Sequence, residues 1–106
     1  MKLTFEEACS SAADLFEAAP ETWTRGVIAR DDRGNSAFYH DYAAVSFCLV
    51  GALKAMGHRS PWRRLEPFAN KLGFDDSDGT SCVSANNRGG RLVAIKVLRM
   101  AAGEIE

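Results

Sequence analysis

The chain has 106 residues, the commonest size of a single protein domain. Apolar residues make up 46% of it and charged residues 25%, which is typical of a globular protein and excludes a disordered chain. Thirteen basic and fourteen acidic residues give a net charge of −1, which removes the general electrostatic reason to expect nucleic acid or an anionic membrane as partner. Residues 1–106 are therefore predicted to form one domain.

The first helix is predicted from Thr4 and Glu7, whose spacing is that of a capping box. Apolar residues then recur at intervals of three and four up to Ala19, and Pro20 ends the helix. The segment that follows is less regular. Residues 27–30 and 37–39 flank a strong turn pattern at 31–35, which is compatible with a small two-stranded hairpin or with a plain loop.

The most apolar segment predicts a central helix from about Tyr42 to Met56, capped by Asp41. Small residues at 44, 48, 51 and 55 would form one stripe that lets another helix approach closely. The apolar run from Ala43 to Ala55 spans about 20 Å as a helix, less than the roughly 30 Å of a membrane core. No membrane association is therefore expected.

Two further helices complete the expected fold. One runs from Ser60 to about Leu72, and the last from about Gly90 to Ala102. A polar connection at 75–87 and a loop at 86–90 join them. The sequence thus predicts a mainly α domain of about four helices, with the hairpin after the first helix as an option.

Three cysteines, Cys9, Cys48 and Cys82, form no CxxC pair, and their odd number disfavours a disulfide framework. The N-terminus carries Glu6 and Glu7 where the apolar part of a secretory signal would begin. Both observations favour reduced thiols and a cytoplasmic location.

A thiol hydrolase needs a cysteine, a histidine and an asparagine or aspartate, and Cys48, His58 and Asn86 supply these types. The competing interpretation, which we favour, is that Cys48 lies in the core as a small apolar residue. No metal or cofactor is expected. The residues at 75–79 resemble a calcium loop but fail its register, and His40 and His58 have no partner at zinc-ligand spacing.

Two basic segments are candidate binding surfaces. The first has an aromatic residue among arginines and consists of Arg59, Trp62, Arg63 and Arg64. The second leads into the predicted last helix and consists of Arg88 and Arg91. They could contact nucleic-acid phosphates, but an acidic protein surface is the favoured partner. The loop from Asn86 to Arg91 could also hold an anion at a helix N-terminus, or its glycines could serve only a tight turn.

Several short motifs run over most of the chain: Trp23-Thr-Arg-Gly26, the helix segment 47–53 with Cys48 and Gly51, and Asn86-Asn87 before the last helix. This pattern resembles a domain-of-unknown-function family of small bacterial and phage proteins, which has a W-x-x-G segment, a C-x-x-G-A-L helix and a W-N-D loop. Ala85 and Asn87 replace the tryptophan and aspartate of that loop. The resemblance implies a compact, mainly helical accessory protein, phage-encoded and acting in the host cytoplasm, and it implies no catalytic residues.

The expected function is that of a small non-enzymatic protein that binds a host or phage protein and inhibits a host defence protein. Two alternatives stay open: a cysteine-type hydrolase that uses Cys48, His58 and Asn86, and a nucleic-acid or nucleotide-binding module that uses the arginines.

Overall fold

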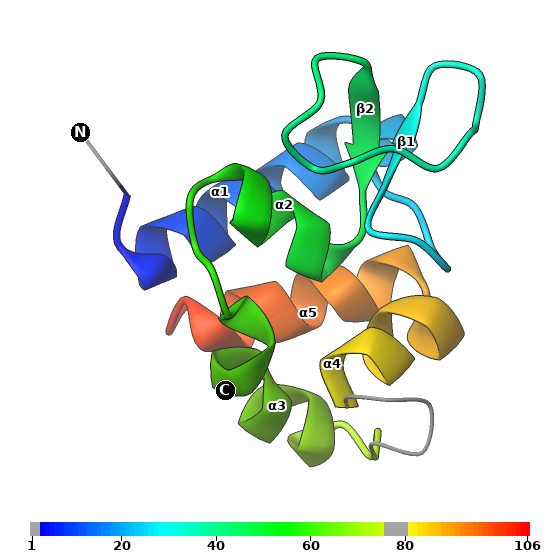
Figure 1. Ribbon diagram of the computed structural model, residues 1–106. Helices are drawn as coiled ribbons and strands as arrows, with labels where there is room; N and C mark the ends of the chain where they lie inside the picture. The colour runs from blue at the N-terminus through cyan, green and yellow to red at the C-terminus, as the bar shows by residue number, and fades with distance from the viewer. Residues whose placement is uncertain (1–2, 76–80) are drawn as a thin grey trace.

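The computed structural model describes residues 3–75 and 81–106. Five α-helices and a small two-stranded antiparallel sheet make up this part of the chain, so the mainly α prediction is confirmed (Figure 1). The elements follow in the order α1 (Phe5–Ala18), η1 (Pro20–Thr22), β1 (Ala29–Asp31), β2 (Ala44–Phe47), α2 (Leu49–Ala55), α3 (Pro61–Lys71), α4 (Ser81–Ser84), η2 (Ala85–Gly89) and α5 (Arg91–Ala101).

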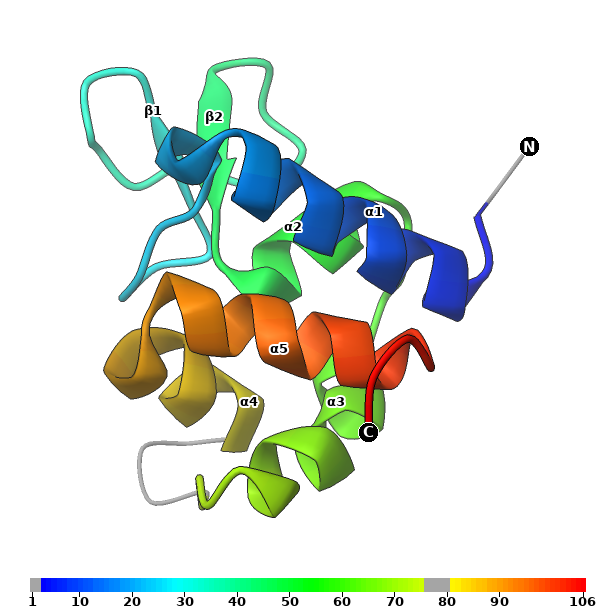
Figure 2. The same cartoon turned by 180° about the vertical axis from the view of Figure 1, so that it is seen from behind.

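The ends of α1 and α5 agree closely with the sequence pattern. The Thr4 side chain accepts a hydrogen bond from the Glu7 backbone N–H at 3.1 Å, and the Glu7 carboxylate accepts one from the Thr4 N–H at 2.8 Å. This is the predicted capping box. The helices α1 and α5 lie along each other in opposite directions, as both views show (Figure 2).

The sheet corrects the predicted start of the central helix. β1 pairs antiparallel with β2, so that Ala29 faces Phe47 and Arg30 faces Ser46. A small two-stranded sheet after the first helix was one of the two options left open, and it is present, but its second strand lies at 44–47 and not at 37–39. Alternation of small or polar residues with Val45 and Phe47 suits a strand, and this pattern overrides the apolar run that indicated a helix from Tyr42.

A second correction concerns residues 81–89. They were expected to belong to a polar connection and a loop, which gave a predicted total of about four helices. They form the short helix α4 and one wide helical turn of π type, η2, which ends at Gly90 with φ of +88°. Ser81, Cys82 and Ser84 are buried, so tertiary packing orders a segment whose own helix propensity is weak.

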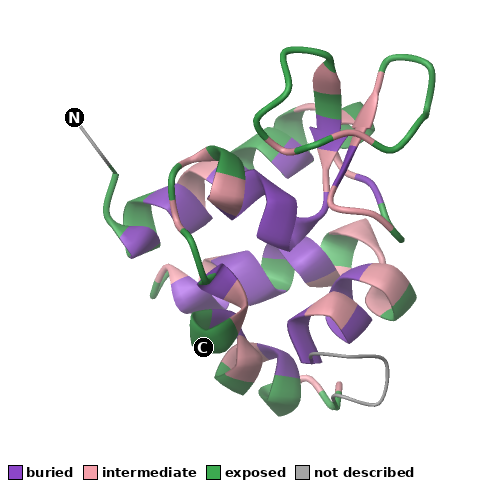
Figure 3. Cartoon of the chain, viewed as in Figure 1, coloured by how far each residue is buried: buried purple, intermediate pink, exposed green. Residues whose placement is uncertain are grey.

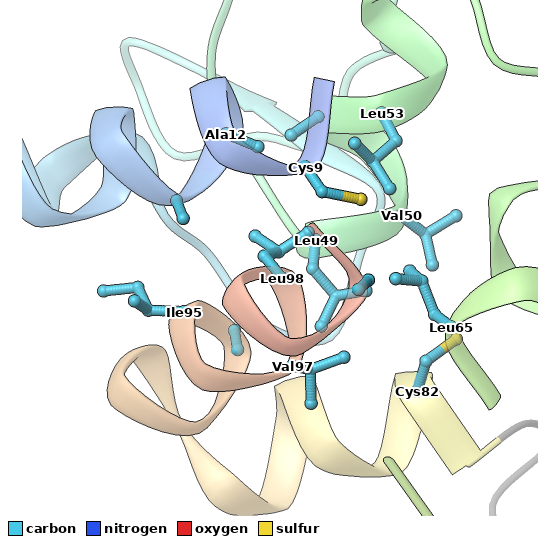
Figure 4. Packing of buried hydrophobic residues seen from close by; sticks show 14 of the residues in the cluster. Cys9, Ala12, Leu49, Val50, Leu53, Leu65, Cys82, Ile95, Val97 and Leu98 are labelled. Atoms are coloured by element: carbon cyan, nitrogen blue, oxygen red, sulfur yellow. The ribbon is translucent and has the colours of Figure 1, made fainter. Parts of the chain in front are cut away.

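One hydrophobic core lies between α1, α2 and α5, with α3 and α4 closing it from below in Figure 1 (Figure 4). Phe16, Leu49, Leu53, Leu65, Val97 and Leu98 are among its fully buried side chains. Figure 3 shows that the long connection between β1 and β2 is exposed along most of its length.

Candidate functional site: a cavity at the start of α2

An open cavity of about 200 Å³ lies beside the first turn of α2. Two other segments complete its wall: the stretch before β1 and the stretch around η2. The lining residues are Gly26, Val27, Ile28, Cys48, Val50, Val83, Asn86 and Asn87. Valine and isoleucine side chains dominate this wall, and none of its residues carries a charge.

Asn86 holds the three segments around the cavity together. Its side-chain oxygen accepts hydrogen bonds from the Trp23 indole N–H at 2.8 Å and from the Leu49 backbone N–H at 3.1 Å. Its side-chain nitrogen donates to the Thr24 carbonyl and to the Asn87 side chain, both at 3.1 Å. The residue is 1% exposed, so a single buried carboxamide satisfies groups from three parts of the chain.

Cys48 is the N-cap of α2, and its sulfur accepts a hydrogen bond from the Gly51 backbone N–H at 3.3 Å. Burial raises the pKa of the thiol, and the hydrogen bond from Gly51 offsets part of that rise. The thiol is therefore protonated at neutral pH and is a weak nucleophile. Burial also raises the pKa of Cys9, to about 12. Cys48 is 9% exposed, whereas Cys9 and Cys82 are fully buried, so Cys48 alone among the cysteines reaches solvent.

His58 lies away from this cavity. It follows the C-terminal end of α2, whereas Cys48 precedes the helix, and seven helical residues span about 10 Å. The imidazole contacts the Phe5 ring edge-on at 5.8 Å between centroids. The structure thus brings Cys48 and Asn86 to one cavity and leaves out the imidazole that would deprotonate the thiol.

Arg25 and Arg30 lie beside the cavity and were missed in the sequence analysis. The guanidinium of Arg25 lies 5.2 Å from the centre of the Trp23 ring and donates to the Asn87 carbonyl at 3.2 Å. Arg30 donates to the Arg25 carbonyl at 3.1 Å and to the Thr24 hydroxyl at 2.8 Å. The signal in the sequence was the glycine at position 26, because glycine readily adopts the positive φ, here +84°, that the backbone has beside Arg25.

The arginines predicted to bind a partner fall into two separate groups. Arg59 and Arg63 are exposed near the start of α3, while Arg64 forms an ion pair with Glu6 at 3.2 Å and covers the Phe5 ring. Trp62 is half-buried and lies 5.2 Å from the Lys54 ammonium group.

The second group lies at the opposite end of α5 from the start of α3 (Figures 1 and 2). Arg88 is exposed in η2, and Arg91 donates to the Phe16 carbonyl at 3.0 Å. The two groups do not form one continuous surface.

A second hollow, of about 520 Å³, lies along the connection between β1 and β2. Phe38 lines it together with the carboxylates Asp31 and Asp41, and Ile28 lines both this hollow and the cavity at α2. Nearby, Phe38 is 69% exposed and Tyr42 is completely exposed.

Within residues 3–75 and 81–106, no three histidine, cysteine or acidic side chains are grouped so that they could hold a metal ion. Of the segment compared with a calcium loop, residues 76–79 lie outside the described residues. None of the described helices is long and apolar enough to span a membrane.

Comparisons of the chain with protein-family models, with curated proteins and with solved structures find no match.

Proposed function

We propose that this chain is a small non-enzymatic accessory protein that binds another protein. The observation that carries this proposal is the exposure of large apolar side chains on and beside the connection between β1 and β2. Phe38 is 69% exposed, Val45 is 48% exposed, and Tyr42 is completely exposed. All three side chains come from residues 38–45, and aromatic residues are enriched in protein interfaces.

The finer proposal is that the partner is a host defence protein and that the chain is phage-encoded and acts in the host cytoplasm. It depends on the resemblance described above. Arg59, Trp62, Arg63 and Arg64, or Arg88 and Arg91, are proposed as a second contact surface for an acidic part of the partner.

Affinity purification from a bacterial host tests the proposal. The double variant Phe38→Ser, Tyr42→Ser should fold and should lose the partner that the wild type retains. Leu92→Ser is the matched control, because Leu92 on α5 is 70% exposed and lies outside this connection. A partner retained equally by all three proteins would overturn the assignment to the aromatic side chains. A loss confined to Arg59→Glu, Arg63→Glu would move the contact to α3.

A cysteine-type hydrolase is the second candidate, because Cys48 and Asn86 line the same cavity. This candidate predicts that iodoacetamide modifies Cys48 in the folded protein and that Cys48→Ala abolishes hydrolysis of a chromogenic ester. An unmodified thiol and an unchanged background rate in the variant would exclude it. For the nucleic-acid alternative, a salt-dependent shift of short DNA or RNA is the corresponding test.

A further inference from the structure

The cavity at the start of α2 has firmly held walls. Asn86 bonds to Trp23, Thr24 and Leu49, and the Asn87 side chain accepts a hydrogen bond from the Gly26 backbone N–H at 2.9 Å. These bonds tie the three wall segments to one another. The cavity is therefore formed before any ligand arrives, which lowers the entropy cost of binding.

The volume and lining of the cavity suit one apolar side chain. An apolar cavity of about 150 Å³ accommodates a benzene molecule. The cavity here measures about 200 Å³ and is lined mainly by Val27, Ile28, Val50 and Val83. A leucine, methionine or phenylalanine side chain of another protein would fill it.

The charge beside the cavity is positive. The guanidinium of Arg25 is fixed by the Asn87 carbonyl, and one nitrogen of Arg30 lies 3.9 Å from the position that a Cβ atom on Gly26 would occupy. Neither arginine forms an ion pair with a carboxylate in the described part of the chain. Arg30 donates one hydrogen bond from each of its three guanidinium nitrogens, to the Thr24 hydroxyl and to the Gly34 and Arg25 carbonyls. Its two terminal nitrogens each keep a second N–H, and Arg25 donates a single bond to the Asn87 carbonyl, so both groups keep donors that a partner's carboxylates could use.

We infer that the cavity receives one apolar anchor side chain of a partner protein, and that Arg25 and Arg30 bind acidic residues flanking that anchor. This inference rests on the proposed function, since it assumes that the partner is a protein. It adds a site distinct from the exposed aromatic side chains on the connection between β1 and β2. It also specifies the partner segment as an apolar residue flanked by acidic residues.

Selection from a displayed library of random twelve-residue peptides tests the inference. The wild-type protein is the bait, and Val83→Phe is the competing bait in which an added ring fills the cavity. Enriched peptides should share an apolar residue flanked by aspartate or glutamate, and Val83→Phe should not retain them. Val27→Phe fills the cavity from another wall, so the test stands if Val83→Phe fails to fold.

The charge requirement is tested with one enriched peptide made synthetically. Arg25→Glu should weaken its binding at least about tenfold, and replacing the acidic residues of the peptide by glutamine should remove that difference. Arg63→Glu is the matched control, because Arg63 is an exposed arginine on α3. Equal weakening by both variants would indicate a general charge effect and would overturn the role of Arg25.

Three outcomes would overturn the inference: no enrichment over the filled-cavity baits, enrichment that those baits share, or enriched peptides that lack acidic residues. Its failure is distinct from failure of the proposed function. If the wild type and Val83→Phe retain the same host protein, the proposed function holds and the anchor site is wrong. If the wild type retains no host protein, the proposed function itself is wrong.

Discussion

At the scale of single residues, the buried side chain of Asn86 connects segments that lie far apart in the sequence. Three separate groups, the Trp23 indole, the Leu49 N–H and the Thr24 carbonyl, use this one buried side chain. Removal of the side chain leaves buried donors and an acceptor without partners, and each such group costs about 1–3 kcal/mol.

We therefore predict that Asn86→Ala lowers the free energy of unfolding by about 3 kcal/mol or more, a large share of the roughly 5–15 kcal/mol typical of a domain. Urea denaturation checks this. Asn70→Ala is the control, because Asn70 is exposed on α3 and lies outside this network. An equal loss of unfolding free energy in Asn86→Ala and the control variant would contradict the special role of Asn86.

Cys48 caps the N-terminus of α2 and lines the cavity beside it. Cys48→Ala removes the acceptor for the Gly51 N–H and should cost about 1 kcal/mol, the usual cost of losing an N-cap. Cys48→Ser keeps an acceptor at the same position and should stay within about 0.5 kcal/mol of the wild type. Thermal denaturation of both variants decides the point, and a larger loss in the serine variant would show that the apolar character of the thiol matters more than the cap.

At the scale of elements, α2 shows what sequence patterns can and cannot specify. The sequence indicated a buried helix containing Gly51 and Leu53, and both are buried in α2. It placed the start of the helix seven residues too early, because Ala44 to Phe47 are apolar enough for either structure. Pairing with β1 favoured a strand, and the paired residues lie between 13 and 18 positions away in sequence.

The close approach at Gly51 was predicted, but the neighbour was not. A second helix was expected there, and the structure instead places the Ile28 carbonyl 2.0 Å from where a Cβ atom of residue 51 would lie. That carbonyl also accepts a hydrogen bond from the Cys48 N–H at 3.2 Å, which limits its freedom to move away.

Gly51→Ala should therefore lower the free energy of unfolding by about 1–3 kcal/mol, although alanine has a higher helix propensity than glycine. Chemical denaturation measures the change. Ala55→Leu in the same helix is the control, since Ala55 is exposed and tolerates a larger side chain. A Gly51→Ala variant with unchanged stability would show that α2 shifts away from β1 at little cost.

At the scale of the whole molecule, Arg99 connects α1, α5 and the C-terminal segment. It forms ion pairs with Asp14 at 2.6 Å, with Glu17 at 3.0 Å and with Glu104 at 2.8 Å. The hydrogen bond from Arg99 lowers the pKa of Glu104 below its ordinary value of 4.5, and the Ser10 hydroxyl adds to this. A carboxyl group with a lowered pKa stabilises the fold above pH 4.5, and that contribution is lost as the pH falls through the pKa of the folded state.

Arg99→Gln should accordingly lower the melting temperature at pH 7 by a few degrees, roughly 2–5 °C. The difference from the wild type should shrink below about pH 4 and in 1 M salt, because protonation and screening both weaken the ion pairs. Calorimetry over this range measures it. Arg63→Gln replaces an exposed arginine on α3 and should leave the melting temperature unchanged. A pH-independent loss in Arg99→Gln would assign the effect of Arg99 to packing.

The candidate site was only partly predictable at this scale. Cys48 and Asn86 were singled out because their residue types carry chemistry, and the fold does bring them to one cavity. His58 belonged to the same hypothesis on residue type alone, and only the direction of α2 separates it from the others. No local sequence pattern points to Arg25 or Arg30 as site residues. Their positions depend on hydrogen bonds that the fold creates, from Arg25 to the Asn87 carbonyl in η2 and from Arg30 to the Arg25 carbonyl.

The residue Ile28 forms part of the wall of both the cavity at α2 and the hollow beside Phe38. A ligand that displaced the Ile28 side chain from one space would change the shape of the other, and occupancy at the two places would then be thermodynamically linked. Such linkage is reciprocal. If a group bound in the cavity changes the affinity of the hollow beside Phe38 by some factor, binding in that hollow changes the affinity of the cavity by the same factor. A partner that engages both places would consequently bind with an affinity that the two separate affinities do not predict, and Ile28→Ala would alter the cooperativity between them.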